Sequence, residues 1–338
     1  MKKIIYLVSL LFLLGACSSE NSNSSSSESP STEAESNSGE ELVLNAVSFL
    51  SKDHPLTATI QDWIDQVEEG TEGRVKVNWR GGADVIPVGE QFEALNSGVI
   101  DINFTYIGQY QSLAPESLSI ALSQAQPWEE RENGFYDFMV ERHKLLDTMY
   151  IGRWLTGSPR IWLNEPISSV DDFSSITLRS APNYNRLFDE MGVNSAMIDP
   201  SEVYTSLQTG IVDGFVYGGL SGPRTDGWTD STKYVLDHPF WTQNCTILMN
   251  LEKWDQISTT DQEAILAATA EYERYMVDYY EELDKEERVA LEEAGVEFFE
   301  FSEEEKEKFL DLAYEVEWDY LVQETPELIE KMRELTGN

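Results

Sequence analysis

The chain is poor in the residues that carry most enzymatic chemistry. Its 338 residues include two cysteines and three histidines. The histidines, His54, His143 and His238, stand far apart and show no metal-ligand spacing. No Gly-x-Ser-x-Gly, His-Glu-x-x-His or phosphate-binding loop pattern occurs. We therefore predict no enzyme, no metal site and no cofactor. One alternative stays open, a pair of dispersed carboxylates acting as acid and base in an extracellular hydrolase.

Basic residues are also scarce. Lys and Arg total 23 against 62 Asp and Glu, which gives a formal net charge of −39. Binding to phosphates needs clustered positive charge, so we predict no nucleic-acid partner. The excess acid is spread along the chain rather than held in one tail, a pattern that favours a halophilic source, where salt screens the repulsion. The alternative is an ordinary acidic secreted protein.

The N-terminus has the layout of a secretory signal. Lys2 and Lys3 precede an apolar run, Ile4–Leu14, about half the ~20 residues that span a bilayer. Leu14-Gly15-Ala16-Cys17 resembles the bacterial lipobox, which implies that residues 1–16 are removed and that Cys17 is diacylated. An ordinary signal followed by a chance cysteine is the alternative.

Residues 18–40 are nearly all Ser, Asn, Glu, Thr, Pro and Gly. Such a segment buries too little apolar surface to offset its ordering entropy, so we predict a lipid anchor followed by a disordered tether. With Cys17 in the anchor, Cys245 has no disulfide partner, and we interpret it as a buried thiol packed as a small hydrophobe.

The pattern from residue 41 onward alternates between strand and helix. Strands are predicted at 41–49, 75–79, 99–104, 175–179, 194–198 and 211–217. Helices are predicted at 55–68, 90–96, 183–191 and 200–209. This alternation is typical of α/β layers with parallel strands and crossover helices. The alternation of strands and helices stops after the strand at 99–104 and begins again at the strand at 175–179. We therefore predict two lobes, mainly 41–160 and mainly 161–258.

The C-terminal region, 259–338, is predicted to be helical. Its helices are expected at 259–295, 302–323 and 326–336. Ser302 and Glu305 have the spacing of a reciprocal capping box. The long first helix either covers the core or braces both lobes.

Several stretches resemble a known family. They are Gly70–Val77, Glu90–Asp101, Arg160–Ile167, Ile176–Arg179 and, most specifically, Ser201–Gly214. They are similar to the substrate-binding subunit of tripartite ATP-independent periplasmic (TRAP) transporters, solute-binding protein family 7, in its lipoprotein form. The resemblance implies a periplasmic-binding-protein-like α/β fold, two lobes closing on a ligand, with a long helix spanning both. It also implies capture of a small organic acid outside the cell and its delivery to the small and large membrane subunits of a transporter.

The resemblance implies a role for Arg179, which matches the arginine that binds the ligand carboxylate in this family. A guanidinium offers two parallel donors to a carboxylate and stays charged when desolvated. A structural ion pair with one of the many carboxylates is the alternative. Four further positions are predicted to line the pocket: Arg160, Tyr217, Glu90 and Trp154.

Two features leave the substrate open. Many members have an acidic residue where this chain has Val216, which argues against metal-assisted binding. Phe104, Tyr106, Tyr110 and Trp228 are candidates for the pocket wall, although each residue type is more often core.

Two other functions stay open: a binding lipoprotein of an ATP-driven importer, and the sensor lobe of a receptor.

Overall fold

The computed structural model describes residues 41–242 and 244–337. The predicted signal peptide (1–16), the anchor at Cys17 and the tether (17–40) lie outside the described residues. Among the described helices, none is long and apolar enough to cross a membrane.

The first sheet has five strands in the order β2-β1-β3-β10-β4. Their bounds are β1 (Leu42–Ser48), β2 (Val75–Gly81), β3 (Ile102–Tyr106), β4 (Thr148–Leu155) and β10 (Cys245–Asn250). β1 runs parallel to β2 and β3, as the alternating pattern predicted. β10 is inserted antiparallel between β3 and β4. The segment 161–258, predicted to lie mainly in the second lobe, therefore also contributes a strand to the first sheet.

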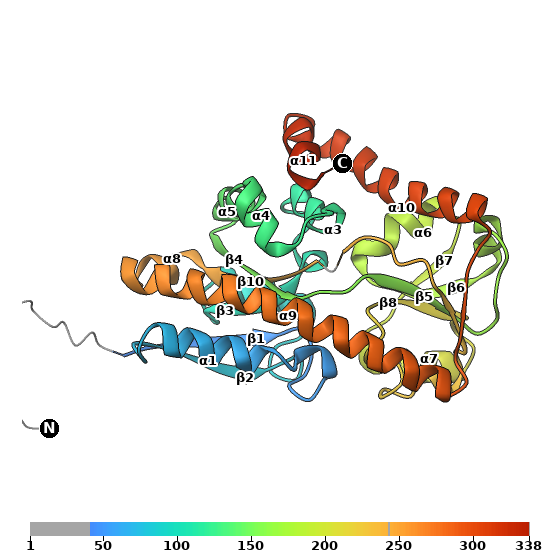
Figure 1. The fold of residues 1–338 in the computed structure, drawn as a ribbon, viewed down its shortest axis with the longest axis horizontal. Coiled ribbons are helices and arrows are strands. Elements are labelled where there is room, and N and C mark those ends of the chain that lie inside the picture. Colours follow the sequence, from blue (N-terminus) through green and yellow to red (C-terminus); the bar gives the residue numbers. More distant parts are fainter. Residues whose placement is uncertain (1–40, 243, 338) are drawn as a thin grey trace, which may run out of the picture. The chain divides into compact units, whose positions relative to one another are not determined.

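The second sheet has six strands in the order β11-β9-β5-β8-β6-β7. Their bounds are β5 (Pro159–Leu163), β6 (Thr177–Ser180), β7 (Asn194–Met197), β8 (Gly214–Gly218), β9 (Tyr234–Leu236) and β11 (Glu297–Phe299). β6 is parallel to β7 and β8, and β5 is antiparallel to β8 and β9. Figure 1 shows the two sheets side by side, and we call each sheet with its helices a lobe.

The shorter helices cover the two sheets. Their bounds are α1 (Ile60–Gly70), α2 (Gln91–Asn96), α3 (Ser119–Leu122), α4 (Pro127–Asn133), α5 (Phe135–Lys144), α6 (Asn185–Glu190), α7 (Pro200–Gln208) and α8 (Leu251–Asp255). α1 buries Ile60, Trp63, Ile64 and Val67, a spacing that places them on one helical face. All eight residues of β4 are buried, because α5 and α9 both pack against this strand.

The helix predicted at 259–295 is α9 (Thr259–Glu293). It contacts α1 and β4 of the first lobe and β11 of the second, and Figure 1 shows it passing both sheets. This long helix spans both lobes, as the family resemblance implied. Two helices follow it, α10 (Glu303–Glu324) and α11 (Ile329–Thr336). Ser302 caps α10 by accepting a hydrogen bond from the Glu305 amide, but the predicted reciprocal bond is wrong. The Glu305 carboxylate instead accepts from the Val170 amide at 2.8 Å.

α9 and β4 approach each other closely at Gly152. A Cβ at this position would lie 2.5 Å from Glu273 Oε1 and 2.7 Å from Thr269 Cγ2, so only glycine fits. The buried Glu273 carboxylate accepts from Arg131 Nε at 2.7 Å and from the Arg153 amide at 2.8 Å. These bonds compensate the cost of burying its charge and fix the helix on the first sheet.

Candidate functional site

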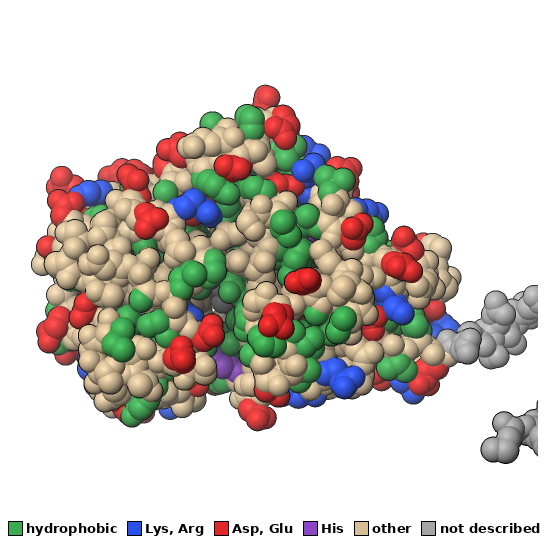
Figure 2. Space-filling model, turned by 180° about the vertical axis from the view of Figure 1, so that it is seen from behind, with side chains coloured by type: hydrophobic (Ala, Val, Ile, Leu, Met, Phe, Trp, Pro, Cys, Tyr) green, Lys and Arg blue, Asp and Glu red, His purple; other side chains and the backbone are tan. Residues whose placement is uncertain are grey.

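A cavity of about 480 Å³ lies between the two lobes. The space-filling view shows a hollow on one face, bordered by hydrophobic and acidic side chains, with a histidine at its edge (Figure 2). The first lobe lines the cavity with residues at or after the ends of β1, β2 and β3 and around the start of β10: Phe49, Leu50, Leu56, Val88, Gly89, Tyr106, Gly108, Gln109, Asn244 and Cys245. The second lobe lines it from β6, β8 and the loop before α7: 179–184, 197–200, Glu202 and 216–218. Its size is within the ordinary range for a small-molecule site.

Arg179, at the third position of β6, lies in the cavity wall with 6% of its surface exposed. Nε donates to the Ile198 carbonyl at 2.8 Å, and Nη1 points to the Val216 carbonyl at 3.5 Å. No carboxylate within the described part of the chain forms an ion pair with it. Two main-chain carbonyls thus orient the guanidinium and leave N–H donors for a ligand.

The surroundings of Arg179 are mainly aromatic. Burial lowers the pKa of Arg179, whereas nearby Tyr217, Tyr106 and Tyr184, and after them the Asp199 carboxylate, act in the opposite direction. Burial in turn raises the pKa of Tyr106 to about 12, and it raises the pKa values of Tyr217 and Tyr184 as well. All three hydroxyls therefore stay protonated at neutral pH. The site presents one buried positive charge surrounded by neutral donors, an arrangement suited to an anion.

Tyr217 also lines the cavity, as predicted, from the fourth position of β8. Its hydroxyl lies 3.1 Å from Nε2 of His54, which stands before the 3-10 turn Pro55–Thr57 of the first lobe. Its ring packs edge-on against Trp228, with centroids 5.2 Å apart. Trp228 itself is 2% exposed and belongs to the core behind the wall.

The structure places Arg160 elsewhere. It lies in β5 and its Nε donates to Asp237 Oδ1 at 3.2 Å, while Asp284 lies 3.9 Å from Nη1. Arg160 and Asp284 border a second cavity, of about 400 Å³, which Arg179 does not line. Arg160 therefore does not line the cavity that contains Arg179, contrary to the prediction that both arginines contact the same ligand. Its charge neutralises two carboxylates instead.

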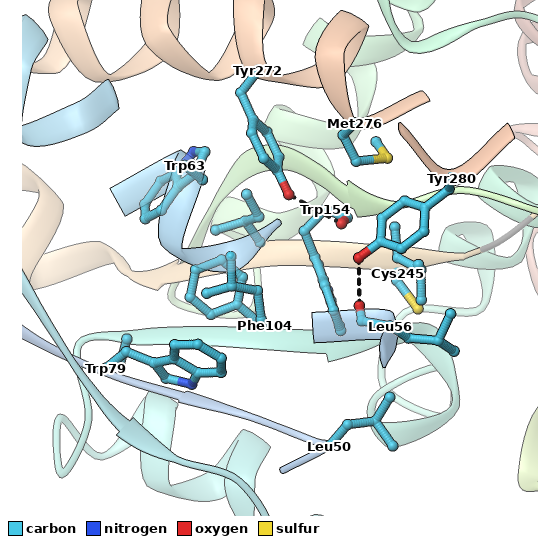
Figure 3. Close-up of a cluster of buried hydrophobic side chains, with 14 of the residues drawn as sticks. Leu50, Leu56, Trp63, Trp79, Phe104, Trp154, Cys245, Tyr272, Met276 and Tyr280 are labelled. Carbon is cyan, nitrogen blue, oxygen red and sulfur yellow. Dashed lines mark hydrogen bonds between the residues drawn. The ribbon is translucent and has the colours of Figure 1, made fainter. Parts of the chain in front are cut away.

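Trp154 and Glu90 do not line the cavity between the lobes either. Trp154 is fully buried, and its indole N–H donates to the Thr105 carbonyl at 3.0 Å. Figure 3 shows it in the core, together with Phe104 and Tyr280. Glu90 stands at the start of α2, and its neighbours Val88 and Gly89 reach the cavity in its place. Of the aromatic candidates, Tyr106 forms part of the wall, whereas Phe104 and Tyr110 are completely buried.

Several polar wall residues have no signature in the sequence. The amides Gln109 and Asn183 and the carboxylates Asp199 and Glu202 all line the cavity. Each follows a strand end that reaches the gap between the lobes, so knowledge of the sheet order is what reveals them. Cys245 is buried as predicted, but it also borders the cavity.

The fold and the site together define a class. Two α/β lobes linked by a long helix, with a cavity between them and a buried, oriented arginine in its wall, form a two-lobed solute-binding protein. The family model described as bacterial extracellular solute-binding protein, family 7, matches residues 46–323. The chain therefore belongs to this family of extracytoplasmic solute receptors.

Individual relatives agree with the family. A monocarboxylate 2-oxoacid-binding periplasmic protein of Nostoc sp. is 23% identical over 252 residues, which is 71% of this chain and 68% of that protein. A solute-binding protein of Chromohalobacter salexigens is 24% identical over 288 residues, 81% of this chain and 83% of that one. Among solved structures, a TRAP periplasmic solute-binding protein of Desulfovibrio salexigens with bound orotic acid superposes with a TM-score of 0.79. It is 18% identical and covers 88% of this chain and 99% of its own.

Proposed function

We propose that this protein captures a small organic acid and that Arg179 holds the carboxylate. The observation that carries the proposal is a buried guanidinium in the cavity wall, oriented by the Ile198 and Val216 carbonyls and without an ion-pair partner among residues 41–242 and 244–337. An unpaired buried charge costs free energy, and a ligand carboxylate in bidentate contact compensates it. The Nostoc and Desulfovibrio relatives, whose ligands are organic acids, support the same class.

The arrangement of the wall supports binding by lobe closure. Arg179 and Tyr217 come from the second lobe, and Tyr106, Phe49 and Gln109 from the first. Closing the lobes on a ligand expels water, and the lower local dielectric then strengthens the ion pair with Arg179. No catalytic step belongs to this proposal.

The test is calorimetry on the purified protein in high salt, with a panel of monocarboxylates, dicarboxylates, keto acids and sugar acids. We expect one class to bind, and Arg179→Met to weaken that binding at least 100-fold. Arg160→Met is the matched control, since Arg160 borders the other cavity. It should leave the dissociation constant within a few-fold of wild type. Near-wild-type affinity in Arg179→Met contradicts the proposal.

We also propose that the closed, loaded protein delivers its ligand to the small and large membrane subunits of a TRAP transporter. The family match supports this partner. Reconstituted vesicles holding both subunits should accumulate ligand only when the protein and an ion gradient are present. Uptake that requires ATP instead would identify the partner as an ATP-driven importer.

We further propose that Cys17 anchors the protein to the outer face of the cell membrane after cleavage of residues 1–16, and that the source lives in high salt. The sequence Leu14-Gly15-Ala16-Cys17 supports the anchor. The charge of −39 supports the halophilic source, because repulsion of this size is tolerated best where ions screen it.

A further inference from the structure

The cavity is lined by fewer basic than acidic side chains, and this limits the charge that a ligand can carry. Among the described lining residues, Arg179 is the one Lys, Arg or His, whereas Asp199 and Glu202 both carry carboxylates. Both acids are exposed, at the rim of the cavity. One ligand carboxylate is neutralised by Arg179. A second would find no cation and would face two like charges, which disfavours it.

The histidine behind the wall does not change this count. His54 contacts Tyr217 but is not among the lining residues. Burial lowers its pKa to about 4, so it is neutral at pH 7. The nearby Asp226 carboxylate, 3.8 Å from His54 Nε2, adds a further acid on that side rather than a cation.

Two amide side chains reach the cavity with buried atoms that have no partner. Gln109 Nε2 and Oε1 and Asn183 Oδ1 form no hydrogen bond with any described residue. Asn183 is 3% exposed. Buried polar atoms without partners cost free energy, and a bound group that both donates and accepts removes the cost. The amides therefore specify an uncharged polar group on the ligand.

The two amides come from different lobes, on two turns that both line the cavity. Gln109 lies in the 3-10 turn Ile107–Gln109 after β3, and Asn183 lies in the 3-10 turn Pro182–Tyr184 after β6. These two turns are in contact. Gly108 permits the approach, because a Cβ there would lie 3.2 Å from Asn183 Oδ1 and 2.4 Å from the Tyr106 ring. A polar ligand group here would bridge the lobes when they close.

We propose that the cavity selects a monocarboxylic acid whose far end is uncharged and both donates and accepts hydrogen bonds: an amide, a lactam or a hydroxyl. The carboxylate binds Arg179, and the far end binds Gln109 and Asn183. This selection rests on the proposed function, since it assumes that Arg179 binds a carboxylate.

The test compares ligands of the same shape that differ in charge. Malonamate, succinamate and glutaramate are matched with malonate, succinate and glutarate, with pyroglutamate and 3-hydroxybutyrate added, by calorimetry in high salt. We expect the tightest ligand of the panel to be a monocarboxylate, and each monoamide to bind at least 10-fold more tightly than its dicarboxylate. A dicarboxylate as the tightest ligand, with binding lost in Arg179→Met, overturns the selection and leaves the proposed function intact. Binding of no carboxylate at all overturns both.

Two sets of variants test the residues. Gln109→Leu should weaken monoamide binding at least 10-fold with little effect on dicarboxylate binding. The preference for the monoamide over its matched dicarboxylate should therefore decrease or disappear. Gln208→Leu is the control, because Gln208 is exposed and bonds Ser231 away from the cavity. Asp199→Asn with Glu202→Gln changes rim residues and should raise dicarboxylate affinity several-fold. An unchanged preference in both sets of variants overturns the assignment.

Discussion

The Tyr217 hydroxyl lies 3.1 Å from Nε2 of His54, and this contact joins strand β8 of the second lobe to the turn before α1 of the first. Nδ1 of His54 accepts a hydrogen bond from the Leu56 amide at 3.1 Å, so the ring proton of the neutral histidine is on Nε2. Nε2 therefore donates to Tyr217, which leaves the tyrosine hydroxyl hydrogen available to a ligand in the cavity. The pair links lobe closure to the orientation of a donor for the ligand.

Tyr217→Phe removes this donor and keeps the ring that packs on Trp228. A hydrogen bond to a charged group contributes about 1.5–3 kcal/mol, so we expect the dissociation constant of the ligand to rise roughly 10- to 100-fold. Calorimetry measures it. Tyr275→Phe is the control, because Tyr275 bonds Asp62 on the exposed side of α9. A wild-type constant in Tyr217→Phe would show that the hydroxyl does not reach the ligand.

The stability of the protein should fall as the solution is acidified below neutrality. Burial lowers the pKa of His54 and of His143 to about 4, from 6.5 in the unfolded chain. The unfolded state therefore binds more protons between these values, and stability decreases as pH falls from about 6.5 toward 4. We expect about 2 kcal/mol per histidine between pH 6.5 and 5. Urea denaturation at pH 7 and pH 5 measures it.

The same titrations assign the effect to individual residues. His54→Asn keeps an acceptor near the Leu56 amide and removes one titrating group. Its stability should depend less steeply on pH over this window than that of wild type, by the contribution of one histidine. A pH dependence equal to that of wild type would mean that His54 titrates normally in the folded protein.

Gly152→Ala should destabilise the protein strongly. The new methyl group would lie 2.5 Å from Glu273 Oε1, so either the buried carboxylate loses its bonds to Arg131 and the Arg153 amide or α9 shifts away from β4. Disrupting a buried, paired charge typically costs 3–5 kcal/mol. Thermal unfolding of this variant and of Gly89→Ala, where a Cβ meets nothing within 4 Å, gives the comparison. Equal melting temperatures would contradict the close approach.

Cys17→Ser should release the protein from the membrane. In a bacterium that expresses the full chain, labelled fatty acid should be incorporated into the wild type but not into the variant. The variant should then be found in the soluble fraction or the medium. Labelling that persists in Cys17→Ser would place the lipid on another residue.

The sequence predicted the elements that local periodicity determines, but not the pairings that depend on the folded chain. α9 begins at the predicted residue, and β7 and α7 begin where Asn194 and Pro200 placed them. β10 is uniformly buried, so it carries no alternation to show which sheet it joins. Its insertion between β3 and β4 is a long-range choice, which explains why the lobe boundary was only approximate.

The site was predicted to a similar extent. Arg179 and Tyr217 follow from the family pattern, and the structure places both in the wall. Arg160 is also a charged residue in a strand, but its partners Asp237 and Asp284 come from distant segments that only the fold brings near. Gln109 and Asn183 are uncharged and ordinary in the sequence, and they become distinctive only when buried without partners.

The position of Cys245 makes its thiol a chemical probe of lobe opening. Its thiol is 2% exposed, borders the cavity, and is the one free thiol in the described part of the chain. An alkylating reagent must therefore enter between the lobes to reach it. Burial raises the pKa of the Cys245 thiol, so the reaction is slow and its rate follows the fraction of time that the lobes are open. Ligand should slow labelling as it shifts the lobes toward the closed state, so one native thiol reports how far they close.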